Sequence, residues 1–536
     1  MKRFLFLTVS ILILCAILCA CDTSHGPVDT TAGSVTDTPT DTPTDAPAEA
    51  PTETEPETEP ETEPEVLVSA PAPKRILDQL AGRVSPRWIS SVCMQVTLTG
   101  QGIDAVQDAF LKEGYILAAT TPAHGTKLGT AVLKSLEHVV TLIETADGSL
   151  HVLWEKADAV TADPLYAVRN PAQGDVVMAQ IGIARGDKTD NPMIGMCYVY
   201  RLSDGTALII DGGINSTDCS VNLFRTLQQL DIARDGDGKY RITAWIFTHG
   251  HADHMGTFKR FSAQYADRTD LTYVMYSFPT EEVAPKGNTT GEEFAEIVRA
   301  SYPNARRVSP HAGLTYFFGN LKIHMLYAPE LLYNSPEGVN YYNTTSLLFR
   351  IEANGQSVLH MGDASETASK AAWINSESDA FKSSALQITH HGLYTGPDSH
   401  DWSYMRKLYT ATDAEIGLLP MGTRNPGDGR NGRHTVLVGW GMAGYQVSFV
   451  IDKKDNRGGA STDQAYYDKF VADVAAGAAD RETLFGYDGI NTVKNRSGMV
   501  TYISASEDTL MATVFTMGEG GFTVVSNGKL DTWLGE

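Results

Sequence analysis

The chain has 536 residues, of which 42% are hydrophobic as in an ordinary globular protein, and its formal net charge is −23. This length allows one large domain with smaller companions, because a domain usually has roughly 100–200 residues. So large an acidic excess argues against binding along nucleic acids, which requires clustered Lys and Arg, but not against a small anionic substrate held by metal.

Residues 1–21 have the pattern of a bacterial lipoprotein signal peptide. A Lys-Arg start precedes an apolar run, residues 4–20, that is shorter than the about 20 apolar residues of a membrane-spanning helix. A cleaved signal is therefore favoured over an uncleaved membrane anchor. The sequence Leu-Cys-Ala-Cys at 18–21 resembles a lipobox, which implies that Cys21 is lipidated. The expected location is the extracellular face of the bacterial cytoplasmic membrane, with a lipid anchor.

Residues 22–85 are predicted to form a disordered linker. The segment 22–65 consists of repeats rich in Thr, Pro, Asp and Glu, with thirteen acidic residues and no Lys or Arg. Such a stretch cannot bury enough apolar surface to offset the chain entropy lost on folding. We expect it to act as an extended spacer between the lipid anchor and the folded part of the chain.

Residues 86–172 are predicted to form a small α+β domain. Apolar residues alternate over 88–99 as in a strand, and 103–111 has the spacing of an amphipathic helix. A hairpin is expected over 138–155, across an Ala-Asp-Gly-Ser turn. The histidines of this region are scattered, so no chemical role is assigned to it.

Residues 173–455 show strands alternating with helices, the pattern of an α/β domain. A hairpin is expected over 197–210, a helix over 218–229 and a buried strand over 242–247. This strand leads directly into the most informative segment of the chain.

Residues 456–536 are harder to assign to a domain. A helix is predicted over 464–476, and strands are predicted over 499–504, 511–515 and 522–525. The region is either a C-terminal β-rich extension or the part that completes the preceding sandwich.

The segment 248–256 contains a dense set of metal-ligand side chains. His249, His251, Asp253 and His254 lie within six residues, directly after the apolar strand. In a strand-to-helix turn, the first two histidines point to the same side, and the other two residues reach over the edge. Imidazole nitrogens and carboxylate oxygens at this density are the ligands of a divalent ion such as Zn²⁺.

This arrangement resembles the H-x-H-x-D-H signature of the metallo-β-lactamase fold superfamily. Three further segments fit the family in order and spacing: Asp211-Gly212-Gly213, a strand that ends in Gly362-Asp363, and a strand that ends in His390-His391-Gly392. The resemblance covers roughly residues 174–420. It implies an α/β fold, the αββα metallo-β-lactamase-like sandwich, here preceded by the small α+β domain.

The resemblance also implies two divalent metal ions, with zinc as the expected metal. In this assignment His249 and His251 hold the first ion, and Asp363 bridges both. The second ion is held by the set Asp253, His254 and His391. Adjacent residues of a strand point in opposite directions, but at a strand end either His390 or His391 could turn inward. We expect His391 to be the ligand and His390 to have a catalytic role, in contact with substrate or supporting a ligand.

One departure from the family pattern favours a particular branch. The further histidine that many members carry between the signature and the bridging aspartate is missing from 326–330, and an Asn-x-x-Ser segment begins at Asn343. These features resemble the hydrolase domain of bacterial competence DNA-uptake channels and the surface phosphorylcholine esterases. The branch implies a more open metal that the substrate contacts directly. Asn343 is expected either to form a catalytic hydrogen bond near the site or to form a structural turn.

The predicted function is a surface-anchored dinuclear metallohydrolase of a small or polymer-attached phosphoester or phosphodiester. A metal-bridging hydroxide is the expected nucleophile, because two ions lower the pKa of a shared water to near 7. Asp253 is expected to orient that hydroxide as a catalytic residue. The alternatives are a nuclease, a lactonase or β-lactamase-type metallohydrolase, and a non-catalytic surface binding protein. The acidic charge and the lack of a Lys/Arg-rich run argue against nucleic acid as a partner.

Overall fold

The computed structural model describes residues 67–118, 120–182, 195–287, 289–335, 337–392, 403–422, 435–442, 445–452, 492–494, 500–505 and 511–529. All of them belong to one unit, Pro64–Glu536, which is separate from Met1–Glu63. The predicted signal peptide with Cys21, and the predicted helix over 464–476, lie outside the described residues. Within the described ranges, no helix combines the length and the apolarity that a membrane crossing requires.

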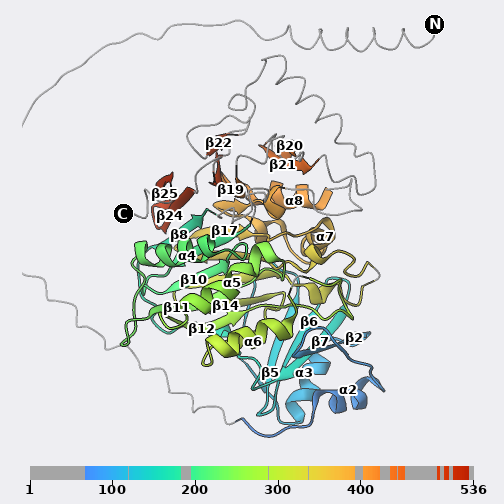
Figure 1. The fold of residues 1–536 in the computed structure, drawn as a ribbon. Coiled ribbons are helices and arrows are strands. Elements are labelled where there is room, and N and C mark those ends of the chain that lie inside the picture. Colours follow the sequence, from blue (N-terminus) through green and yellow to red (C-terminus); the bar gives the residue numbers. More distant parts are fainter. Residues whose placement is uncertain are drawn as a thin grey trace, which may run out of the picture. The chain divides into compact units, whose positions relative to one another are not determined.

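The small N-terminal domain is a six-stranded antiparallel sheet with two helices on one face (Figure 1). In sheet order its strands are β1 (Arg87–Trp88), β2 (Cys93–Thr99), β7 (Ser149–Lys156), β6 (His138–Glu144), β5 (Gly129–Lys134) and β3 (Ile116–Leu117). Its helices are α2 (Pro73–Ala81) and α3 (Ile103–Lys112). Val140 and Leu142 of β6 pack toward the helices, whereas Val139 and Ile143, on the opposite face, join the core of the next domain.

The N-terminal boundary of this domain corrects a prediction. Residues up to 85 were expected to belong to the disordered linker, but α2 forms within that range. Pro73 occupies the first turn, where its missing N–H costs no helical hydrogen bond. Ile76 and Leu77 are buried in the core of the small domain. The helix was not predicted because its apolar face is short and follows a long segment of charged repeats.

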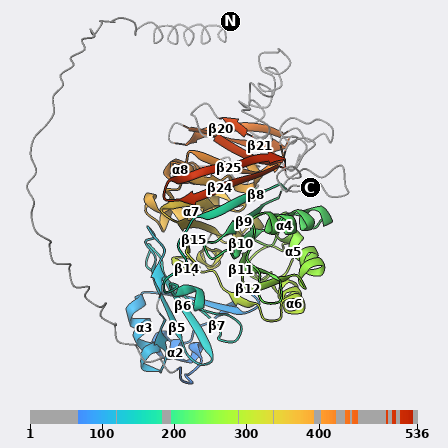
Figure 2. The same ribbon diagram turned by 90° about the vertical axis from the view of Figure 1, so that its left-hand side faces the viewer.

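The larger domain consists of two facing sheets with helices packed against them (Figures 1 and 2). The first sheet has the order β13 (Arg306–Val308), β12 (Thr269–Met275), β11 (Tyr240–Ile246), β10 (Ala207–Asp211), β9 (Cys197–Arg201), β8 (Val176–Ile181), β24 (Met511–Gly518) and β25 (Gly521–Lys529). The second has the order β22 (Thr492–Lys494), β23 (Val500–Ala505), β19 (Ile416–Gly422), β18 (Ala385–Gln387), β17 (Gln356–His360), β16 (Leu348–Ala353), β15 (Leu321–Tyr327), β14 (Leu314–Phe318) and β4 (Thr121–Pro122).

The alternation of side chains along β10 shows how the layers are built. Leu208 and Ile210 lie in the core between the two sheets, whereas Ala207 and Ile209 lie in a second core beneath the helices. The helices over the first sheet are α4 (Thr217–Gln229), α5 (Ala252–Tyr265) and α6 (Gly291–Ser301), and those that accompany the second sheet are α7 (Glu366–Ile374) and α8 (Ser403–Thr412). The predicted α/β sandwich is confirmed.

The C-terminal strands complete this sandwich, so the second of the two predicted alternatives holds for the described residues. β24 pairs with β8, and β23 pairs with β19, so both sheets take strands from the end of the chain. Residue 455 is therefore not a boundary between two separate domains. A hairpin of β20 (Thr435–Met442) and β21 (Tyr445–Asp452) forms its own two-stranded sheet.

Polar contacts join the small domain to loops of the larger one. Gln95 Nε2 of β2 donates to the carbonyl of Glu330 at 3.0 Å, and Asn334 Nδ2 donates to Thr97 Oγ1 at 2.7 Å. The imidazole of His311 lies between two buried carboxylates, 3.8 Å from Glu155 of β7 and 3.6 Å from Glu330. The small domain thus packs against the chain segment that leads from Glu330 toward Asn343.

Candidate metal centre

The candidate site lies where parallel strands of both sheets end. β10 and β11 are parallel neighbours in the first sheet, and β17 and β18 are parallel neighbours in the second. Asp211 ends β10, His249 follows β11, Asp363 follows β17, and His391 follows β18. Ligands commonly bind at the carboxyl ends of such strands, because the loops that leave the sheet converge there.

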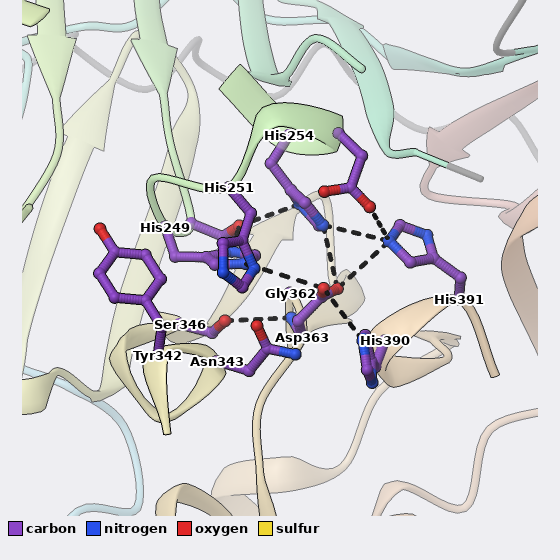
Figure 3. A network of polar contacts seen from close by, with 12 residues as sticks. His249, His251, His254, Tyr342, Asn343, Ser346, Gly362, Asp363, His390 and His391 are labelled. Atoms are coloured by element: carbon purple, nitrogen blue, oxygen red, sulfur yellow. Dashed lines mark hydrogen bonds and ion pairs between the residues drawn. The ribbon is translucent and has the colours of Figure 1, made fainter. Parts of the chain in front are cut away.

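One group of four side chains offers donor atoms to a common point. Asp253, His254, Asp363 and His391 each place a ligand atom within 4.8 Å of the others. His254 Nε2 lies 3.2 Å from His391 Nε2 and 3.0 Å from Asp363 Oδ1 (Figure 3). His391 Nε2 also lies 3.1 Å from Asp253 Oδ2. We call these four residues the second group, after the predicted second ion.

A smaller group lies beside it. His249, His251 and Asp363 form this first group, again with ligand atoms within 4.8 Å of one another. His249 Nε2 is 3.0 Å from His251 Nδ1 and 3.7 Å from Asp363 Oδ2. The structure thus brings all six predicted metal ligands together, in the two groups that were expected.

Asp363 is shared between the groups through its two carboxylate oxygens. Oδ1 faces His254 and His391, whereas Oδ2 faces His249. Its side chain is only 2% exposed. The preceding residue, Gly362, has φ +52°, and a Cβ there would lie 2.9 Å from the Cβ of Thr248. Glycine therefore allows the chain to turn sharply enough to place Asp363 between the two groups.

The far side of each imidazole in the second group is occupied by a fixed acceptor. His254 Nδ1 lies 2.7 Å from Asp211 Oδ2, and His391 Nδ1 lies 2.9 Å from the carbonyl oxygen of Pro420. The carbonyl of Pro420 is closer to His391 Nδ1 than the backbone N–H of Gly195, which lies 3.4 Å away. In the neutral rings each Nδ1 therefore carries the proton, and each Nε2 presents a lone pair. Two lone pairs that face each other at 3.2 Å repel unless a cation lies between them. Two nitrogens on one tetrahedral Zn²⁺ would be about 3.4 Å apart, given Zn–N bonds of about 2.0–2.1 Å, so the residues fit a divalent ion.

The electrostatics of the site agree with this interpretation. Burial lowers the pKa of His254, but the carboxylates of Asp363 and Asp211 outweigh it and raise that pKa well above its usual range. Burial likewise raises the pKa of Asp363, yet the neighbouring His254, His391 and His390 bring it well below its usual range. In the absence of a cation, the raised pKa values of His254 and His391 favour the uptake of protons that balance the buried carboxylates, whereas burial lowers the pKa of His249 and His251. A metal ion would displace those protons, which is how metal binding becomes dependent on pH.

The structure places His390 and His391 differently. Both have left-handed backbone angles, with φ of 49° and 54°, in the turn η5 (Thr389–Gly392) that follows β18. His391 belongs to the second group, whereas His390 Nε2 lies 3.8 Å from Asp363 Oδ2 on another side of that carboxylate (Figure 3). Strand alternation does not apply here because the strand has already ended at Gln387, so both rings reach the site.

Asn343 lies in the turn η3 (Tyr342–Thr345) beside the first group. It is fully buried, and its Nδ2 donates to Tyr341 Oη at 3.1 Å. Ser346, which ends the Asn-x-x-Ser segment, accepts a hydrogen bond from the backbone N–H of Asp363. The segment thus fixes the position of the shared aspartate.

Sequence reasoning did not include Asp211 among the site residues. Its carboxylate accepts hydrogen bonds from the backbone N–H and the hydroxyl of Thr248, both at 2.8 Å, as well as from His254. It orients a metal ligand without belonging to either group. Asp211 could have been found from the sequence, because the Asp-Gly-Gly segment at the end of a buried strand was one of the segments on which the family resemblance rests.

Comparisons with known proteins give one matching family model and several similar solved structures. Residues 190–272 match the family model of the Metallo-beta-lactamase superfamily. None of the curated proteins matches the chain. Similar solved structures include the metallo-beta-lactamase fold protein YhfI from Bacillus subtilis, with 14% identity, 46% of this chain and 86% of that chain covered, and a TM-score of 0.29.

Two other similar structures are Zn(2+)-bound PqqB from Methylobacterium extorquens and the metallo-beta-lactamase MIM-1 from Novosphingobium pentaromativorans. PqqB has 11% identity over 40% of this chain and 72% of its own, with a TM-score of 0.26. MIM-1 has 13% identity over 49% of this chain and 82% of its own, with a TM-score of 0.23. These low identities and TM-scores say nothing about the substrate of this chain. The matched segment, residues 190–272, is thus similar to the metallo-beta-lactamase superfamily, and it contains His249, His251, Asp253 and His254. Together with Asp363 and His391 these side chains form the ligand set of a metal-dependent hydrolase.

Proposed function

We propose that the protein is a dinuclear metal-dependent hydrolase of phosphoesters or phosphodiesters that works outside the cell on a lipid anchor. The observation that carries the proposal is the pair of ligand groups that share Asp363, one with four protein donors and the other with three. When bound there, two divalent ions would supply Lewis acidity and lower the pKa of a water molecule. A smaller ligand set leaves room for an oxygen of the substrate.

The chain's own residues have separate tasks in this proposal. Asp363 is almost completely buried and holds the two groups together, whereas the side chain of Asp253 is 24% exposed. One oxygen of Asp253 faces His391, and in this proposal the partly exposed carboxylate also accepts a hydrogen bond from the attacking water. His390 is 15% exposed beside Asp363 and is suited to contact a phosphoryl oxygen from the open side.

The choice of a phosphoester rests on charge and on the donor count. A phosphoryl group offers several hard anionic oxygens, which suit a divalent ion with open positions. Residues 66–536 have 52 Asp and Glu but 40 Lys and Arg, and this acidic excess disfavours a long polyanion such as DNA, because the backbone phosphates of a polymer would be repelled. A small or polymer-attached phosphoester brings only one or two such charges to the site.

A panel of substrates tests the proposed activity. The full chain, loaded with Zn²⁺ or Mn²⁺, is assayed on bis(p-nitrophenyl) phosphate, p-nitrophenyl phosphorylcholine, single- and double-stranded DNA, a lactone and a β-lactam. We expect the first two to be hydrolysed with kcat/KM at least 100-fold above the rest. Preferential cleavage of the lactone, the β-lactam or DNA would overturn the substrate class.

The proposed location is supported by the export pattern of residues 1–21 and by the acidic spacer that follows. Expression in a bacterial host with labelled palmitate should give a labelled protein in the membrane fraction, exposed to added protease. Cys21→Ser should abolish the label. A wild-type chain that remains unlabelled in the cytoplasm would contradict the proposed anchor.

A further inference from the structure

The amide oxygen of Asn343 lies unpaired beside the metal centre. Asn343 is 0% exposed, and among the described residues its Oδ1 has no hydrogen-bond partner. The other end of the amide is held, because Nδ2 donates to Tyr341 Oη at 3.1 Å. An unsatisfied buried acceptor costs free energy, and native proteins rarely keep one without a ligand to satisfy it.

The turn that carries Asn343 is fastened to both sides of the first group. The backbone N–H of Leu347 donates to the carbonyl of Thr248, the residue before His249, at 3.0 Å. On the other side, the backbone N–H of Asp363 donates to Ser346 Oγ at 3.1 Å. The backbone around Asn343 is therefore held between the loop of the paired histidines and the loop of the shared aspartate.

Tyr342, the residue before Asn343, is tightly packed beside the site. Its ring lies 4.9 Å from the ring of His251, centroid to centroid. It is packed so closely against Gly250 and Gly287 that a Cβ on either glycine would overlap it. With Tyr342 held on one side of the turn, the amide oxygen of Asn343 points toward the space between His251 and Asp363 (Figure 3).

We propose that Asn343 Oδ1 is the fourth protein donor to the first ion, beside His249 Nε2, His251 Nδ1 and Asp363 Oδ2. The inference rests on the proposed function, since it assumes that a metal ion binds the first group. Among His, Cys, Asp and Glu of the described residues, that group has three members, whereas the second has four. A side-chain amide oxygen is an accepted ligand of divalent ions and would complete the first group. With four protein donors, the first ion could still take up an oxygen of the substrate by expanding its coordination from four ligands to five.

Metal binding by matched variants tests the proposal without relying on activity. The full chain is stripped with a chelator and titrated with Zn²⁺ against a competing chromophoric chelator. Asn343→Leu removes the donor at similar volume, Asn343→Asp keeps an oxygen donor, and Tyr341→Phe removes only the hydroxyl that holds Nδ2. We expect Asn343→Leu to weaken one ion at least tenfold and to leave the other unchanged, while Asn343→Asp and Tyr341→Phe retain two ions.

Two outcomes would overturn the role of Asn343 as a ligand. If Asn343→Leu binds both ions as the wild type does, Asn343 is not a ligand and the proposal fails. Should that variant not fold, the visible spectrum of Co²⁺-loaded Asn343→Asp decides, because a change in a coordinated oxygen alters the ligand field. An unchanged cobalt spectrum would overturn the proposal. A wild type that binds two ions but hydrolyses no ester would overturn the proposed function and leave the result for Asn343 standing.

Discussion

Asp211 and Pro420 decide which nitrogen of each neighbouring histidine faces the metal centre. Both hold an Nδ1 proton, through hydrogen bonds of 2.7 and 2.9 Å, and so leave the two Nε2 lone pairs directed at one point. A partner of this kind fixes the tautomer and orientation of a metal ligand before any ion arrives. The ligand geometry therefore depends on residues that never touch the metal.

Asp211→Asn tests this dependence. The neutral amide can accept fewer hydrogen bonds than the carboxylate, so one of the two donors on Thr248, or the ring of His254, loses its partner. We expect the affinity for the second ion to fall about 10- to 100-fold, as measured by competition with a chelator. Asp270→Asn, on an exposed position of β12, serves as the control. Equal affinities in the two variants would show that Asp211 has no orienting role.

How far the site could be predicted depends on how local its residues are. His249, His251, Asp253 and His254 lie within six residues, so their spacing alone indicated a metal site. Asp363 follows more than a hundred residues later and could be placed only through the family resemblance. The expected choice of His391 rather than His390 as a ligand agrees with the structure. Strand alternation could not supply it, because both residues have left-handed backbone angles after the end of the strand.

At the scale of elements, β2 and β7 of the small domain hold the segment that leads to the metal centre. The ion pairs of His311 with Glu155 and Glu330 are buried, and Ser309 also donates to Glu155. Burial lowers the pKa of His311, but the two carboxylates outweigh it and raise the pKa to about 9. Removal of one partner from such a buried cluster is costly, because a charge is left without compensation.

This cluster predicts how stability changes with pH. Since the pKa of His311 is about 9 in the folded chain and about 6.5 when unfolded, its stabilising effect is complete below pH 6.5 and is lost as pH rises through 9. This shift in the pKa of His311 contributes roughly 3 kcal/mol at most to the free energy of unfolding. Urea unfolding of the chelator-treated chain should therefore show a free energy of unfolding that declines from pH 7 to 9. In His311→Gln this decline should be smaller, because only the part that comes from other histidines with raised pKa values, such as His254 and His391, remains. Parallel curves for the two proteins would refute the assignment.

Elements with a clear periodicity were predictable, and the exceptions have physical causes. The hairpin over 138–155 follows from two largely apolar runs on either side of an Ala-Asp-Gly-Ser turn, and the helix α4 follows from a spacing of 3.6 residues. α2 was missed because its apolar face has only two buried large side chains, Ile76 and Leu77, next to a charged repeat. The placement of β24 beside β8 needed knowledge of pairing across more than 300 residues, which local patterns do not contain.

At the scale of the whole molecule, the acidic repeats and the sandwich lie in different parts of the chain. Thirteen acidic residues lie in the segment 22–65, ahead of the folded part, and support the proposed spacer rather than the chemistry. The described remainder builds one sandwich from both ends of the chain, with β4 at the edge of one sheet and β24 and β25 at the edge of the other. The metal centre lies where these two sheets meet, so its two ligand groups depend on the sandwich being closed.

The central claim is that two ions shared through Asp363 drive hydrolysis. The most direct measurement is turnover of bis(p-nitrophenyl) phosphate by the chelator-stripped full chain as Zn²⁺ is added in known equivalents. We expect activity to reach its maximum at two ions per chain, and Asp363→Ala to lose at least 1,000-fold in kcat together with at least one bound ion. Full activity at one ion per chain, or an Asp363→Ala variant that keeps both its ions and its turnover, would contradict the account.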